Sequence, residues 1–177
     1  MGKKNKFETN AIHIGNEPDL STGSISPPIN LTSTYVQEGI GKNKGYDYSR
    51  GNNPTRQRLE KNIASLEGGY DAIAFSSGMA ATTALFQDLI QGDHVIISRN
   101  VYGGTYRMTT QVLSKHGLQF DFVDTTEIQN IEKAIKKNTK WIFVETPTNP
   151  MLEVTDISEV SELCKKHNLL FAVDNTF

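Results

Sequence analysis

Residues 169–177 have the sequence LLFAVDNTF, an apolar run that ends in an acid and a turn. Such a short apolar run predicts a buried β-strand over residues 169–173, with Asp174 at its carboxyl end. A strand that is apolar along its whole length belongs in the interior of a sheet, covered on both faces. We therefore expect this strand to have a neighbour on each side, one of them beyond Phe177.

Strands and helices alternate along the chain before this final strand. We expect strands at residues 71–76, 94–98, 118–123, 141–145 and 169–173, and helices at residues 79–90, 104–116, 127–137 and 155–167. Because a helix separates each strand from the next, the sheet should be mainly parallel, with right-handed crossovers. The predicted fold class is an α/β open sheet.

Residues 1–53 have a different character, rich in Gly, Asn, Ser, Thr and Pro without sustained periodicity. A segment of this length and composition rarely forms a core of its own, so we expect an arm that wraps the body or a neighbouring subunit. Pro54 is suited to the first turn of a helix, which should end at Gly68-Gly69. The sequence thus predicts two regions, an arm over residues 1–53 and an α/β body over residues 54–177.

The composition argues against several classes of protein. The chain has 18 Lys and Arg against 20 Asp and Glu, so no basic stripe suggests nucleic acid. No apolar segment follows the basic N-terminus, and no run is long enough to span a membrane. The four histidines lack the spacing of metal ligands. We expect a soluble cytoplasmic protein that binds neither nucleic acid, membrane nor metal.

The single cysteine, Cys164, has no partner for an internal disulfide, as is usual in a reducing compartment. In the helix predicted at residues 155–167 it shares a face with Ile157 and Val160. This position favours a role in the core over a catalytic one.

In parallel α/β sheets, ligands bind at the carboxyl ends of strands and at the N-termini of the helices that follow. The segment SSGMAA at residues 76–81 opens a helix with small residues, which exposes backbone N–H groups to an anion such as phosphate. Close helix packing explains the small residues equally well. Neither G-x-x-x-x-G-K-[ST] nor a G-x-G-x-x-G after a strand occurs, which argues against a nucleotide-binding domain.

Two other loops at the same predicted edge carry polar groups. Tyr102 precedes a glycine pair, where its ring is suited either to stacking on a flat ligand or to packing on its own loop. Asn149 lies between Pro147 and Pro150, where its amide faces a ligand oxygen or only forms a turn.

Charged residues complete the set of candidates. Asp174 ends a buried strand, where a carboxylate is costly unless it is paired. A protonated ring nitrogen is one suitable partner, and the N-cap of a following helix is the alternative role. Arg50 and Arg56 lie on either side of Pro54, around the start of the first long helix, in positions suited to a phosphate or simply to a solvated loop.

The segments YSRGNNPTR (48–56), SSGMAA (76–81), YGGTYR (102–107), ETPTNP (145–150) and AVDNTF (172–177) occur together in this order. The combination resembles the Cys/Met-metabolism enzymes of the transsulfuration group, which depend on pyridoxal phosphate (PLP). That group includes cystathionine γ-synthase, cystathionine γ-lyase, cystathionine β-lyase and methionine γ-lyase. The resemblance runs from about Thr9 to Phe177.

The resemblance implies the large domain of a fold-type-I PLP enzyme that assembles as a homotetramer of tight dimers. It also implies a role for each matching position. Gly78 and Met79 would donate backbone N–H groups to the PLP phosphate, and Tyr102 would stack on the pyridine and is a candidate proton donor. Asn149 would lie near the phenolic oxygen, and Asp174 would keep the pyridine nitrogen protonated. Tyr48 and Arg50 would reach the phosphate bound by the neighbouring subunit.

The implied reaction is γ-elimination or γ-replacement on sulfur-containing or O-acylated amino acids. Methionine γ-lyases typically carry a cysteine in the loop after the stacking tyrosine. Here that loop is Gly103-Gly104-Thr105, which favours cystathionine γ-lyase or γ-synthase.

The lysine that forms the Schiff base in this family has no match among residues 1–177. We expect it beyond Phe177, so that the chain is the first part of the PLP-binding domain and is inactive alone. The alternative is a non-catalytic remnant or partner subunit that binds PLP weakly or not at all. An uncovered final strand would make either form prone to aggregation.

Overall fold

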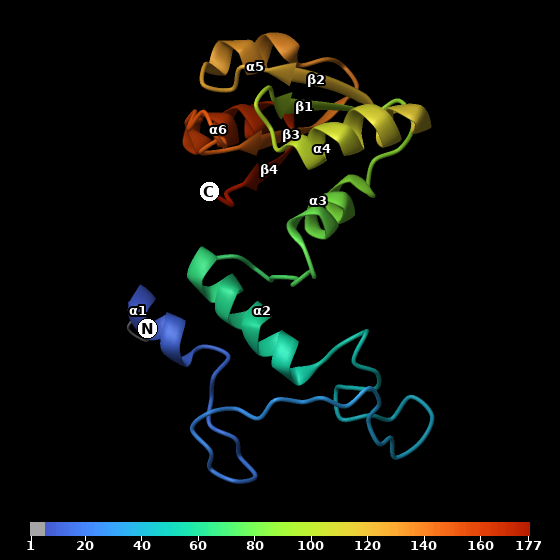
Figure 1. The fold of residues 1–177 in the computed structure, drawn as a ribbon, viewed down its shortest axis with the longest axis vertical. Coiled ribbons are helices and arrows are strands. Elements are labelled where there is room, and N and C mark those ends of the chain that lie inside the picture. Colours follow the sequence, from blue (N-terminus) through green and yellow to red (C-terminus); the bar gives the residue numbers. More distant parts are fainter. Residues whose placement is uncertain (1–5) are drawn as a thin grey trace. The chain divides into compact units, whose positions relative to one another are not determined.

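The computed structural model describes residues 6–177, which form two compact units. The N-terminal unit ends at Ser76, and the C-terminal unit is Ser77–Phe177. Figure 1 shows helices α1 and α2 in the first unit and the sheet with its helices in the second. The helix that the sequence assigned to the body, α2, thus lies in the same compact unit as residues 6–53.

The C-terminal unit is built on a four-stranded sheet in which every pair is parallel, in the order β2-β1-β3-β4. Its elements are α3 (Gly78–Phe86), β1 (His94–Ser98), α4 (Gly103–Arg107), η1 (Met108–Val112), η2 (Leu113–His116), β2 (Gln119–Val123), α5 (Ile128–Ala134), β3 (Thr139–Glu145), α6 (Ile157–His167) and β4 (Leu170–Asp174). The predicted parallel α/β architecture is confirmed.

The two central strands bury both of their faces. Alternate residues of a strand point to opposite faces, so Val95 and Ile97 of β1 enter one core while Ile96 enters the other. The first core comprises Phe86, Val95, Ile97, Val101, Met108, Trp141 and Phe143. The second comprises Ile96, Ile131, Ile142, Val144, Val160, Leu163 and Cys164. The sheet therefore lies between α3 and η1 on one face and α5 and α6 on the other.

The strand predicted at residues 71–76 does not form. Residues 71–75 have no regular secondary structure, and Ile73 is 74% exposed. The amide of Ala74 donates to the Glu60 carboxylate of α2 at 3.0 Å, and no strand within residues 6–177 pairs with this segment. The apolar alternation of this segment was not enough to make it a strand, because a strand also requires a partner for its backbone hydrogen bonds.

The final strand has one neighbour among the described residues. β4 pairs with β3 alone there and lies at one end of the strand order, and the second neighbour expected beyond Phe177 stays a prediction. Its four last residues are half-buried, and Leu170 is exposed. The register places Asp174 directly opposite Glu145 at the carboxyl ends of the two strands.

The helix predicted at residues 104–116 is present, but it changes type along its length. It begins as α-helix α4, continues as the π-helix η1 and ends as the 3₁₀-helix η2. The hydroxyls of Thr109, Thr110 and Ser114 donate to backbone carbonyls three or four residues earlier. Such side chain to backbone bonds compete with the regular helical ladder and bend helices.

The N-terminal unit contains α1 (Phe7–His13) and α2 (Pro54–Glu67). The start of α2 is as predicted, with Asn53 as its N-cap and Pro54 in the first turn, and Gly68 ends it at φ +63°. The sequence did not predict α1, a helix too short to be stable by itself. The Asn62 side chain of α2 holds it by donating to the carbonyls of Asn10 and Ile14 at 3.1 and 2.8 Å.

None of the helices within residues 6–177 has the length and apolar character needed to cross a membrane. Cys164 is 3% exposed, and burial raises the pKa of its thiol to about 11, so the predicted core role is confirmed.

The opposite, amino-terminal edge of the sheet holds a buried histidine. The His94 ring is fully buried, with Nδ1 2.8 Å from the Thr139 hydroxyl and Nε2 3.3 Å from the Asp121 carboxylate. Lys136 faces the same carboxylate and lies 3.4 Å from His94 Nε2. Burial, and then the Lys136 charge, lower the pKa of His94 below its usual value, against the opposing effect of Asp121.

This lowered pKa predicts a stability that falls in mild acid. The unfolded chain binds a proton at His94 near pH 6.5, whereas the folded chain does so only at lower pH. The free energy of unfolding should therefore decrease as the pH falls from about 7 through that window. Urea unfolding from pH 8 to pH 5 measures the slope, which should be smaller in His94→Gln. Parallel curves for the two proteins would contradict this assignment.

Candidate active site

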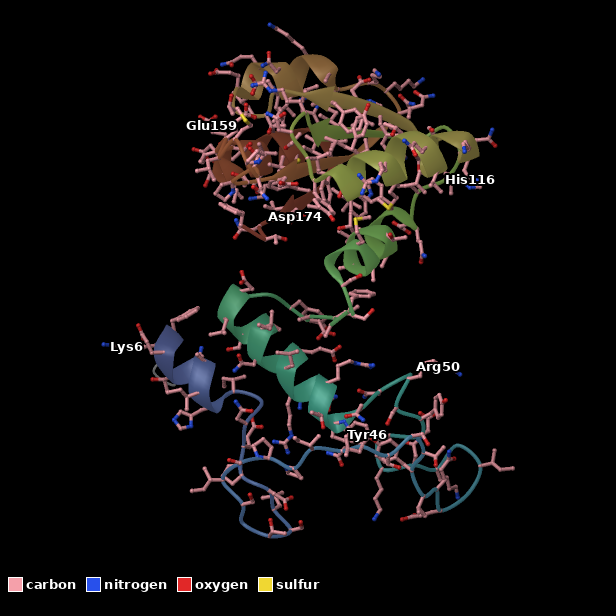
Figure 2. The ribbon with its side chains drawn as sticks, viewed as in Figure 1. Lys6, Tyr46, Arg50, His116, Glu159 and Asp174 are labelled. Carbon is pink, nitrogen blue, oxygen red and sulfur yellow. The ribbon has the colours of Figure 1, made fainter. Side chains whose placement is uncertain are left out.

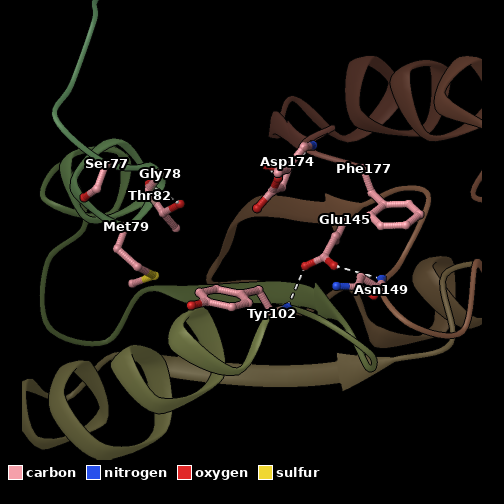
Figure 3. A pocket seen from close by; sticks show the side chains of 10 residues that line it. Ser77, Gly78, Met79, Thr82, Tyr102, Glu145, Asn149, Asp174 and Phe177 are labelled. Carbon is pink, nitrogen blue, oxygen red and sulfur yellow. Dashed lines mark hydrogen bonds between the residues drawn. The ribbon is translucent and has the colours of Figure 1, made fainter.

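A cavity of about 380 Å³ opens at the carboxyl edge of the sheet, entirely within the C-terminal unit. Its lining comes from the start of α3, from the loops after β1 and β3, and from the end of β4. The lining residues are Ser77, Gly78, Met79, Thr82, Tyr102, Glu145, Asn149, Asp174, Thr176 and Phe177. Figure 3 shows the N-terminus of α3, the Tyr102 ring and the Asp174 carboxylate around this space. The volume is in the range of small-molecule sites.

The first turn of α3 offers an anion site to the cavity. Ser77 is the N-cap, and its hydroxyl accepts a hydrogen bond from the amide of Ala80 at 3.1 Å. The amides of Gly78 and Met79 donate to no acceptor within residues 6–177, as is usual for the first residues of a helix. Unpaired amides and the helix dipole together favour a bound phosphate or carboxylate.

The Tyr102 ring is held beside this turn by close packing. Tyr102 is 56% exposed and directly precedes α4. A Cβ placed on Gly104 would lie 2.5 Å from the Tyr102 ring carbon Cε1 and 2.7 Å from the Met79 sulfur. Only a residue without a side chain leaves room for both groups, so a glycine at position 104 allows the ring to lie where it does.

Asp174 presents a carboxylate to the cavity from the end of β4. Its Oδ1 accepts from the amide and the hydroxyl of Thr176 at 3.2 and 2.6 Å. Its Oδ2 accepts no hydrogen bond from the part of the chain that the structure describes. The hydrogen bond from the amide two residues later is the one that an N-cap accepts, so the N-cap role that the sequence left open stays a prediction. One oxygen is thus oriented by the chain while the other remains available to a donor in the cavity.

The loop after β3 carries Asn149 to the cavity mouth. Asn149 is exposed, and its backbone amide donates to Glu145 Oε1 at 3.3 Å. The loop is fixed from inside by two buried threonine hydroxyls. Thr146 accepts from the amide of Thr155, and Thr148 accepts from the amide of Glu153, each at 3.0 Å.

Glu145 is a lining residue that the sequence did not single out. It is 6% exposed, and its Oε2 accepts from the backbone amide of Tyr102 at 2.5 Å. The signal was present, because Glu145 ends a buried strand just as Asp174 does.

Tyr48 and Arg50 lie in the N-terminal unit and pair with each other. The Arg50 guanidinium carbon lies 5.0 Å from the centroid of the Tyr48 ring, a cation–π contact. Both side chains are exposed, and Figure 2 shows Arg50 on the loop that leads towards α2. Their contribution to a neighbouring subunit stays a prediction. Arg56, the other arginine of this segment, instead pairs with Glu60 at 3.1 Å.

A network of charges ties the outer parts of the loops together. Arg99 pairs with Glu153 at 2.7 Å and with Asp124 at 3.0 Å, while the Asn100 amide donates to Glu153 at 2.9 Å. The hydrogen bond from Arg99 lowers the pKa of Glu153 below its usual value, and it raises the pKa of Arg99. Within residues 6–177 no cluster of His, Cys, Asp and Glu is arranged to hold a metal ion.

A family model and the most similar curated proteins point to the same family of enzymes. The model of the Cys/Met metabolism PLP-dependent enzymes matches residues 8–177. The chain is 48% identical over 171 residues to the cystathionine β-lyase of Lactococcus lactis subsp. cremoris. This match covers 97% of this chain and 45% of that protein. It is 46% identical to the "Probable cystathionine gamma-synthase" of Herpetosiphon aurantiacus, across 97% of this chain and 54% of that protein.

A solved structure agrees with these similarities. The crystal structure of cystathionine γ-lyase from Lactobacillus plantarum complexed with L-serine matches with a TM-score of 0.92 and 46% identity. The match covers 97% of this chain and 45% of that one. The chain therefore spans about half the length of the relatives it matches.

Proposed function

The chain belongs to the Cys/Met-metabolism PLP-dependent enzymes, and on this basis we propose that its cavity binds PLP in a transsulfuration enzyme. The proposed reaction of the whole protein is γ-elimination or γ-replacement on a sulfur-containing or O-acylated amino acid. Relatives named β-lyase, γ-synthase and γ-lyase have similar identities, and the loop after Tyr102 argues only against methionine γ-lyase. That loop, Gly103-Gly104-Thr105, lacks a cysteine.

The convergence of three different groups on one cavity carries this proposal. The first turn of α3 offers unpaired amides to a phosphate, and the Asp174 carboxylate offers an acceptor to a protonated ring nitrogen. The exposed Tyr102 ring offers a flat surface for stacking. PLP has all three complementary features, and the cavity of about 380 Å³ is large enough to hold it.

Each cavity residue then has a definite task. Gly78 and Met79 would hold the phosphate, Tyr102 would orient the ring by stacking, Asn149 would contact the phenolic oxygen, and Asp174 would keep a proton on the ring nitrogen. Bound PLP supplies an electron sink for the charge that develops on substrate carbons. The Tyr102 hydroxyl is the candidate donor of a proton to the leaving group.

The proposal includes an assembly and a location. Tyr48 and Arg50 would reach the cofactor phosphate of a neighbouring subunit, within a homotetramer of dimers. Arginine is well suited to this because its planar fork binds phosphate through two parallel hydrogen bonds. We propose a cytoplasmic location on the basis of the single, buried Cys164.

Titration with pyridoxamine 5′-phosphate tests the proposal without relying on a Schiff base. This probe has no aldehyde and cannot condense with exposed lysines, so calorimetry of the 177-residue chain reports only non-covalent recognition. We expect one molecule bound per chain, and weaker binding of pyridoxamine, which lacks the phosphate. No binding of either compound would favour the alternative, a remnant or partner subunit that does not hold PLP.

A second test concerns catalysis and uses the coding DNA. If the reading frame continues past codon 177 into a further strand and a Ser/Thr-rich turn bearing a lysine, the protein that it encodes should turn over cystathionine. A stop codon directly after Phe177 would count against catalysis by this chain and leave the binding proposal to the titration.

Gly104→Ala provides a test of the stacking role. The added methyl group must displace the Tyr102 ring or the Met79 sulfur, so binding of pyridoxamine 5′-phosphate should weaken by about 2- to 10-fold. Stability should not fall in parallel, because alanine is the better helix former within α4. Calorimetry and urea unfolding measure the two effects separately.

Gly103→Ala is the matched control for this change. It adds the same methyl group to the same helix, but its Cβ would approach only the flexible end of Arg107, at 3.2 Å. We expect binding within about twofold of wild type. Equal losses in the two variants would show that the position of the Tyr102 ring does not matter.

A further inference from the structure

We propose that Glu145 is a positioning residue whose buried carboxylate fixes the backbones of Tyr102 and Asn149 relative to each other. It thereby sets where the aromatic ring and the side-chain amide meet a bound ligand. This inference rests on the proposed function for the identity of the ligand. The geometry itself comes from residues of the C-terminal unit alone.

Glu145 is placed to link two loops that are far apart in the sequence. Its Oε2 accepts from the amide of Tyr102, in the loop after β1, at 2.5 Å. Its Oε1 accepts from the amide of Asn149, in the loop after β3, at 3.3 Å. Figure 3 shows both hydrogen bonds from the Glu145 carboxylate, together with the Tyr102 ring and the Asn149 side chain.

The carboxylate is anchored by its own strand. Glu145 is the last residue of β3 and is 6% exposed, and its backbone amide donates to the buried Ser98 hydroxyl of β1 at 3.1 Å. Through Glu145 the two loops are therefore attached to the rigid centre of the sheet. A site held by strand ends is more precise than one held by loops alone.

The chemistry of the link requires a carboxylate in particular. A buried charge is costly unless it is hydrogen-bonded, and here two backbone amides compensate it. Glutamine has one acceptor oxygen and one NH₂ group, so in its place one of the two amides would face another donor. Glu145→Gln keeps the size of the side chain and breaks one of the two links.

The chain contains a second link between the same loops, which serves as a comparison. Glu153 accepts from Arg99 and Asn100, but it does not line the cavity. Arg99 is exposed and Asn100 is half-buried, and ion pairs with an exposed partner contribute little to stability. Glu153→Gln therefore removes the same charge and loosens the same pair of loops at their outer ends.

The first measurement compares ligand binding in the 177-residue chain and in these two variants. Pyridoxamine 5′-phosphate should bind about tenfold more weakly to Glu145→Gln, the effect of one lost hydrogen bond to a charged group. Binding to Glu153→Gln should stay within about twofold of wild type. Equal affinity in Glu145→Gln and wild type would overturn the inference.

The second measurement separates positioning from general stabilisation. Hydrogen exchange followed by NMR should show faster exchange at the amide of Tyr102 or Asn149 in Glu145→Gln, with the central β3 amide of Ile142 unchanged. If exchange instead rises throughout the sheet, Glu145 is only structural and the inference fails. If wild type does not bind the probe, the proposed function fails, while the exchange rates still decide whether Glu145 holds the two loops.

Discussion

Replacing Phe86 with alanine should lower the free energy of unfolding of the C-terminal unit by about 3–5 kcal/mol. Phe86 is the last residue of α3 and is 2% exposed. Its ring lies 5.6 Å from Phe143, 6.2 Å from Phe120 and 6.4 Å from Trp141, measured between ring centroids. Truncation leaves a cavity among three rings that cannot all close in on it, and aromatic contacts are lost as well.

This loss is large compared with the total stability expected of a domain, about 5–15 kcal/mol. Urea unfolding measures it, with the fluorescence of Trp141 as the signal, because the only tryptophan of the chain lies in the same core. Leu85→Ala is the matched control, since Leu85 is the neighbouring residue of α3 but is 41% exposed. Similar losses in the two variants would contradict the anchoring role of Phe86.

The effect should extend to the cavity, because the same helix supplies both. Gly78 and Met79 are at the first turn of α3, and Phe86 holds its other end against the sheet. Once the last residue of α3 loses its packing, the amides of the first turn are no longer held in one orientation towards the cavity. Binding of pyridoxamine 5′-phosphate to Phe86→Ala should therefore weaken even at temperatures where the sheet remains folded.

The sequence was most informative where both faces of a strand are buried. β1 and β3 alternate between two cores, so their apolar runs were unambiguous and their limits were predicted to within two residues. The segment 71–76 has a similar pattern, but its backbone groups find no strand partner in the described structure. Periodicity describes the faces of a segment and contains no information about its neighbours in a sheet.

The candidate site was predictable to the extent that topology determines it. Parallel strands bring their carboxyl ends to one edge, which explains why Tyr102, Asn149 and Asp174 line one cavity although they are far apart in the chain. The contribution of Glu145 was not predictable in this way. It depends on which backbone amides a side chain reaches, and that follows only from the conformation of the loops.

Replacing Asp174 with asparagine should weaken the binding of pyridoxamine 5′-phosphate by about 10- to 100-fold. A hydrogen bond to a charged partner contributes about 1.5–3 kcal/mol, and each 1.4 kcal/mol is a factor of ten in affinity. The Oδ2 atom of Asp174 takes no other hydrogen bond within residues 6–177, so its interaction with a protonated ring nitrogen would be lost in full. Calorimetry of wild type and Asp174→Asn measures the difference.

Asp124→Asn distinguishes a direct contact from a general effect of charge. Asp124 follows β2, at the other end of the strand order from β4, and pairs with Arg99 outside the cavity, so its replacement changes the net charge at the carboxyl ends of the strands by the same amount. If long-range attraction were responsible, both variants would lose affinity, and salt would reduce the difference between them and wild type. A large loss in Asp174→Asn alone places the interaction at the end of β4, where a short-range charged hydrogen bond is largely insensitive to salt.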